Sequence, residues 1–142
     1  MSLLDYLPAI EAEIACCRGD HASALQWADE AIAVASEVGG YFAEAIAWRV
    51  KAVSSLRSGA DPDQAQAFFD RALQWHERGE ARAERAFSSL LWAHSLHSTG
   101  HAERARQWAD EAEELARRHG FVLGRCEQGA AAFLAASSAV AP

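Results

Sequence analysis

Cysteine, proline and long apolar runs are scarce in this sequence of 142 residues. Two of its three cysteines, Cys16 and Cys17, are adjacent, which excludes a disulfide framework and predicts small buried thiols in a reducing compartment. Only three prolines occur among residues rich in alanine, leucine, glutamate and arginine, and this composition favours helix throughout. No apolar stretch reaches the ~20 residues that a membrane-spanning helix needs, so we expect no membrane partner.

A signal peptide and clustered positive charge are also missing. Residues Met1 to Leu7 hold no basic region followed by a long apolar run, so we expect no secretory signal and a cytoplasmic protein. Lys51 is the only lysine, and the formal net charge is −7. Since proteins bind phosphate backbones through clustered lysine and arginine, we expect no nucleic acid partner. The alanine- and arginine-rich, lysine-poor usage suggests a GC-rich bacterial genome.

Motifs of catalysis are absent from the sequence. It has no phosphate-binding glycine loop, no nucleophile elbow, no His-Glu-x-x-His and no Cys-x-x-Cys. Cys16 beside His94 or His97 is a conceivable nucleophile pair, although a buried thiol explains the cysteine equally well. His94 and His97 have the spacing of two metal ligands, but no carboxylate occupies a matching position in that segment. The sequence therefore favours a non-catalytic protein with no metal and no cofactor.

A six-residue segment occurs twice in the chain. The letters Gln-Trp-Ala-Asp-Glu-Ala at positions 26–31 return at positions 107–112, which is 81 positions later. A degenerate copy at 68–72 lies between them, so the period is 41 residues and then 40. Small residues recur at fixed distances in all three copies; they are Gly19, Ala24, Ala31, Gly59, Ala60, Ala65, Ala72, Gly100, Ala105 and Ala112.

Small residues at these places are typical of the tetratricopeptide repeat (TPR), and the chain resembles a TPR array over nearly its whole length. Its long period is similar to the variant in kinesin light chains and in the helical sensor regions of large bacterial transcription regulators. The resemblance implies an all-α fold, a right-handed α-solenoid of three TPR-like helix pairs plus a C-terminal helix. We expect one domain over residues 1–138, with repeats at about 3–40, 41–79 and 80–120, a terminal helix at 121–138, and a frayed tail at 139–142.

Glycine and aspartate divide the sequence into seven expected helices. Asp20 and Asp61 are good N-caps, Pro62 suits a first helical turn, and glycines stand where helices end. The expected helices cover residues 3–17, 21–38, 41–57, 62–78, about 80–98, 101–119 and 121–138.

Aromatic and acidic residues recur with the repeat. Trp27, Phe68 and Trp108 stand at equivalent places, so we expect them in the core between stacked pairs, as we do Trp48. Trp92 fits either core or groove. The recurring aspartates are expected on a solvated face or in local ion pairs; they are Asp29, Asp70 and Asp110.

In TPR arrays the first helix of each pair lines a concave groove, which is where partners usually bind. Residues on that face, spaced by three and four, are mostly apolar here, with Arg49 the main positive charge. A clamp for a peptide carboxylate is therefore disfavoured, and an apolar protein segment or small apolar molecule is the expected partner. The predicted ligand-binding residues are Tyr6, Glu13, Arg49, Val53, Phe87, Leu90, His94 and His97, with Glu127 as a further polar candidate.

The expected last helix has no charge from Ala130 to Ala136. Because the end of a solenoid needs a polar face, we expect this helix to pack on a second copy of the chain, or on a further repeat of a longer protein. The alternative is that an alanine-rich surface is tolerated there.

These observations favour a non-catalytic binding module. Two alternatives stay open: an effector-sensing fragment of a bacterial transcription regulator, and a small biosynthetic enzyme that uses the groove as its active site.

Overall fold

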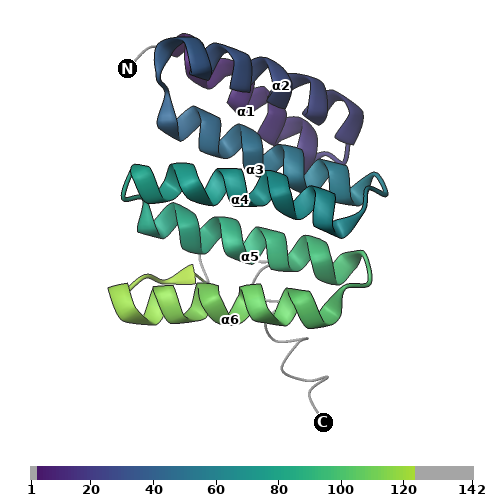
Figure 1. Ribbon diagram of the computed structural model, residues 1–142, viewed down its shortest axis with the longest axis vertical. Coiled ribbons are helices and arrows are strands. Elements are labelled where there is room, and N and C mark those ends of the chain that lie inside the picture. Colours follow the sequence, from purple (N-terminus) through teal and green to yellow (C-terminus); the bar gives the residue numbers. More distant parts are fainter. Residues whose placement is uncertain (1–2, 124–142) are drawn as a thin grey trace. The chain divides into compact units, whose positions relative to one another are not determined.

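The computed structural model describes residues 3–123 of the chain. These residues form six α-helices and no strand, which confirms the all-α class (Figure 1). The chain divides after Ala81 into two compact units, unit 1 and unit 2. Unit 1 holds α1 (Leu3–Cys17), α2 (His21–Val38), α3 (Tyr41–Arg57) and α4 (Pro62–Arg78), and unit 2 holds α5 (Arg82–Ser98) and α6 (Ala102–His119).

Capping residues fix several helix ends where the sequence predicts them. The Asp20 carboxylate accepts a hydrogen bond from the Ser23 amide at 3.1 Å, and the Asp61 carboxylate accepts one from the Asp63 amide at 2.9 Å. Each satisfies an amide at the start of a helix that has no partner within the helix. Pro62 occupies the first turn of α4, where its missing N–H costs nothing. The predicted bounds of α1 to α4 are confirmed.

Two predicted helix starts are wrong. The fifth helix begins at Arg82 because Glu80 has a φ of 52°, a left-handed conformation that no helical residue adopts. The sixth begins at Ala102, with His101 as its N-cap. The predicted seventh helix starts at Phe121, which is not helical. Residues 124–142, including Glu127, the Ala130 to Ala136 run and the tail, lie outside the described residues.

Small side chains let consecutive helices pack closely. Within unit 1, α1 packs on α2 and α3, α2 packs on α3, and α3 packs on α4; within unit 2, α5 packs on α6. All six recurring alanines of the second helices are fully buried, as expected of residues that permit close helix contact; they are Ala24, Ala31, Ala65, Ala72, Ala105 and Ala112.

The recurring aromatics are less buried than predicted. Trp27 is 36% exposed, so its assignment to the core is wrong, while Phe68 and Trp108 are half-buried. One residue of helix turns a side chain by about 100°, and the residue that follows each aromatic points inward instead. The buried residues that directly follow the three aromatics are Ala28, Phe69 and Ala109.

The other side chains whose burial was predicted are divided between the core and the surface. Trp92 is fully buried and belongs to the core. Trp48 is half-buried and stacks on Phe68 with 5.9 Å between ring centres. Cys16 is half-buried but Cys17 is exposed, so the prediction of a buried thiol is wrong for Cys17, the last residue of α1.

The prediction that the recurring aspartates lie on a solvated face is confirmed, since Asp29, Asp70 and Asp110 are all exposed. Asp29 forms an ion pair with Lys51 at 2.6 Å, and Asp70 accepts a hydrogen bond from Gln66 at 2.8 Å.

Between residues 3 and 123, none of the helices combines the length and the apolar character needed to cross a bilayer.

Candidate functional site

The predicted groove residues fall into both units. In unit 1, Arg49 of α3 forms an ion pair with Glu13 of α1 and is only 3% exposed, so its charge is compensated inside the protein. Val53 is also buried. Arg49 and Val53 therefore serve the contact between helices and offer little surface to a ligand, whereas the Glu13 side chain is 37% exposed.

The four predicted residues of unit 2 all lie on α5. Leu90 is buried, Phe87 and His94 are half-buried, and His97 is exposed. Among the described residues, no group of three histidine, cysteine or acidic side chains is arranged to hold a metal ion.

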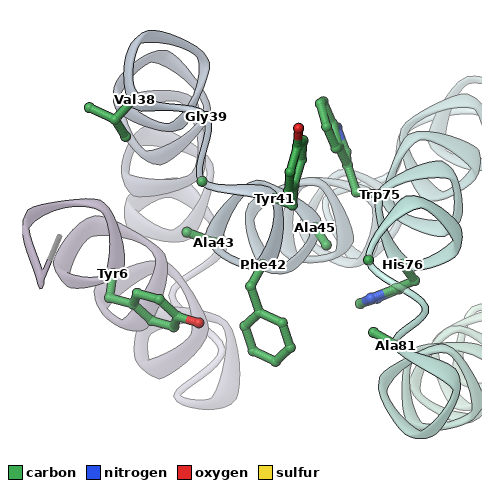
Figure 2. A pocket seen from close by; sticks show the side chains of 12 residues that line it. Tyr6, Val38, Gly39, Tyr41, Phe42, Ala43, Ala45, Trp75, His76 and Ala81 are labelled. Carbon is green, nitrogen blue, oxygen red and sulfur yellow. The ribbon is translucent and has the colours of Figure 1, made fainter. Parts of the chain in front are cut away.

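A cavity of about 580 Å³ lies in unit 1, at one end of its helices. Tyr6, from the start of α1, is the one predicted site residue that lines it. The other lining residues come from the end of α2, the start of α3, the end of α4 and the turn after α4 (Figure 2); they are Val38, Gly39, Gly40, Tyr41, Phe42, Ala43, Ala45, Trp75, His76, Gly79 and Ala81.

Aromatic rings form two pairs in the wall of this cavity. Tyr41 lies against Trp75 with ring centres 5.2 Å apart and planes tilted by 33°, while Tyr6 stacks on Phe42 at 6.0 Å and 29°. Each pair joins different helices, so helix packing fixes the ring positions. In Figure 2 the Phe42 ring has Tyr6 on one side and His76 on the other.

Small residues leave the space that the rings surround. Half of the twelve lining residues are glycine or alanine. Gly39 adopts a φ of 75° as the C-cap of α2, a conformation that glycine reaches without strain. The turn that follows brings Tyr41 and Phe42 to the cavity as the first two residues of α3.

Two aromatic rings at the cavity are exposed to solvent, which distinguishes the cavity from the hydrophobic core. Tyr41 is 54% exposed and Phe42 is 38% exposed, whereas His76 is only 2% exposed. Large apolar side chains left in water around a concavity mark binding surfaces. The guanidinium of Arg78 lies over the Trp75 ring, 4.8 Å from its centre.

Several residues that line the cavity differ from the residues at equivalent positions of the other repeats. Trp75 and His76 stand where α2 has Val34 and Ala35, and where α6 has Leu115 and Ala116. Tyr41 and Phe42 stand where α5 has Arg82 and Ala83. Residues shared by the repeats explain the helix pairs, so the aromatic residues unique to the second repeat need another explanation. This departure is the sequence signal that would have located the cavity.

The chemistry of the cavity suits binding more than catalysis. Its twelve lining residues include no carboxylate, lysine or arginine, and His76 and the two tyrosines are their titratable groups. No nucleophile paired with a base lines it.

The chain matches no protein-family model, no curated protein and no solved structure.

Proposed function

We propose that this chain is a non-catalytic, TPR-like binding module whose ligand site is the cavity of unit 1. It takes an apolar ligand among the rings of Tyr6, Tyr41, Phe42 and Trp75. The observation that carries the proposal is the aromatic cavity itself, three of whose rings, Tyr41, Phe42 and Trp75, stand at positions where another repeat has no aromatic residue.

The TPR-like part of the proposal rests on the repeat. The period of 41 and 40 residues, the buried alanines of α2, α4 and α6, and the left-handed glycines after α2 and α6 all support it. Helical-repeat proteins use a rigid framework to present binding residues that vary between repeats. A concave site lined with apolar residues and a few polar groups is the usual form of a small-ligand site.

The proposal is tested by removing the Trp75 ring. In Trp75→Leu the side chain becomes the one that α6 carries at the equivalent place, so the helix should fold normally. Ring contacts contribute about 0.5–1.5 kcal/mol beyond area burial, and 1.4 kcal/mol is about tenfold in affinity. We therefore expect affinity for an aromatic ligand to fall by up to about tenfold.

The measurement is native mass spectrometry of the purified chain, before and after incubation with a panel of small aliphatic and aromatic alcohols. Wild type should retain one bound molecule, and Trp75→Leu should retain a smaller bound fraction at the same ligand concentration. Trp27→Leu is the matched control, because Trp27 lies on α2 outside the cavity and is partly exposed. The proposal fails if wild type retains no member of the panel, or if both variants lose binding equally.

A further inference from the structure

The walls of the unit 1 cavity are mainly ring faces and ring edges. Tyr6 and Phe42 form one pair, Tyr41 and Trp75 form the other, and His76 adds an imidazole. Aromatic groups prefer offset-stacked or edge-to-face contact with other rings, which adds to the free energy of apolar burial. A planar aromatic ligand gains this contribution, whereas a saturated ligand of equal size does not.

The charge of the lining side chains also determines whether a charged or an uncharged ligand is favoured. None of the twelve lining side chains is a carboxylate, lysine or arginine. A charged ligand would lose hydration on entering without gaining an ion pair in the wall. Aromatic cages also bind organic cations, but here the Arg78 guanidinium already lies over the Trp75 ring. The wall therefore favours an uncharged ligand.

Size and polarity fit a small molecule. The volume of about 580 Å³ lies within the ~300–1,000 Å³ of typical small-molecule sites. Polar side chains are few: the hydroxyls of Tyr6 and Tyr41 and the imidazole of His76. The hydroxyl of Tyr41, whose side chain is 54% exposed, serves to orient a ligand that carries a hydrogen-bonding substituent.

We infer that the unit 1 cavity is selective for an uncharged, planar aromatic molecule with a hydrogen-bonding substituent. This inference rests on the proposed function, and it adds the chemical class of the ligand. Phe42 is the selectivity residue, because its ring is 38% exposed and lies between Tyr6 and His76 (Figure 2).

Four probes of similar size test the inference on the full chain by isothermal titration calorimetry. They are 2-naphthol, its saturated analogue decahydro-2-naphthol, the anion 2-naphthoate and the cation 2-naphthylmethylammonium. We expect 2-naphthol to bind at least about tenfold more tightly than each of the others, which corresponds to about 1.4 kcal/mol.

The Phe42→Leu variant locates the selectivity. Leucine keeps apolar bulk at a partly exposed position, so folding should be unaffected. The variant should bind 2-naphthol several-fold more weakly and decahydro-2-naphthol unchanged. The control Val38→Ala removes an exposed, non-aromatic lining side chain and should leave the ratio of the two affinities as in wild type.

The outcomes separate this inference from the proposed function. Equal or tighter binding of decahydro-2-naphthol overturns the aromatic class but leaves an apolar binding module. Tighter binding of either ion overturns the uncharged class. If no probe binds and the apolar panel also fails, the proposed function and the inference both fall.

Discussion

At the scale of the residue, Glu80 carries the clearest local strain. It is the one non-glycine residue between positions 3 and 123 with a positive φ, at 52°. With the periods of 41 and 40 it stands in the place of Gly39 and Gly120, both left-handed C-caps. A side chain in this conformation costs roughly 1–2 kcal/mol. Its neighbours Gly79 and Ala81 both line the cavity, so the strain lies where a binding site is proposed.

Replacing Glu80 by glycine should therefore stabilise the protein. We expect Glu80→Gly to raise the free energy of unfolding by about 1 kcal/mol, because relief of strain exceeds the entropy that glycine adds to the unfolded chain. Urea denaturation followed by circular dichroism measures the change.

Glu77→Gly is the matched control, since Glu77 is exposed in the last turn of α4. There glycine should lower the free energy of unfolding by up to about 1 kcal/mol. Destabilisation by both changes would show that the glutamate at position 80 contributes more than its backbone conformation costs.

At the scale of the helix, a histidine links α2 to α3. Nδ1 of His21, the first residue of α2, lies 3.3 Å from Oγ of Ser54 in α3. Burial lowers the pKa of His21 from 6.5, the nearby charge of Arg57 lowers it further, and Asp20 acts in the opposite direction. The folded protein therefore favours the neutral imidazole.

This lowered pKa makes stability depend on pH. As pH falls through about 6.5, the unfolded chain binds a proton at this histidine before the folded chain does. The contribution of neutral His21 to stability is thus complete above that pH and declines below it. We expect wild type to lose more free energy of unfolding between about pH 8 and pH 5.5 than His21→Gln, which keeps a polar side chain but does not titrate. Urea titrations at both pH values measure the difference, and equal losses would contradict the assignment.

The helical framework could be read largely from the sequence because its signals are local. Asp20 and Asp61 cap the amides of residues two or three positions on, and a glycine after α2 ends that helix within one turn. The starts of α5 and α6 were misplaced where the usual signal is missing. Glu80 occupies a glycine position, and His101 caps without a side-chain hydrogen bond.

The cavity could not be predicted in the same way. Tyr41 and Trp75 are 34 positions apart and meet only because α3 packs on α4. The predicted ligand-binding residues lie mostly in the middle of helix faces, where Arg49 and Val53 are buried. The cavity lies at helix ends instead, where a regular face does not extend. Tyr6 is the one predicted ligand-binding residue that lines the cavity, and it lies near the start of α1.

At the scale of the whole molecule, unit 1 contains both a core and a complete cavity. Its core joins α1, α2 and α3 through buried alanines together with Ile46 and Val50. Every residue that lines the cavity lies between Tyr6 and Ala81, within unit 1.

A fragment of residues 1–81 should therefore fold and bind by itself. We expect it to be helical by circular dichroism, to unfold cooperatively, and to bind 2-naphthol within about threefold of the full chain's affinity, a difference of under 1 kcal/mol. A fragment of residues 1–61 is the control, because it lacks α4 and with it Trp75 and His76. An unfolded 1–81 fragment would show that unit 1 depends on the residues that follow it.

The packing of each unit 1 helix on the next one along the chain also governs how the protein forms during synthesis. Contacts between neighbours in sequence close short loops, and helical proteins of this kind fold in microseconds to milliseconds. A ribosome adds only about 5–20 residues per second, so each helix pair has time to fold before the next has emerged. Translation, not folding, therefore sets when the cavity closes, which is when Ala81 leaves the exit tunnel.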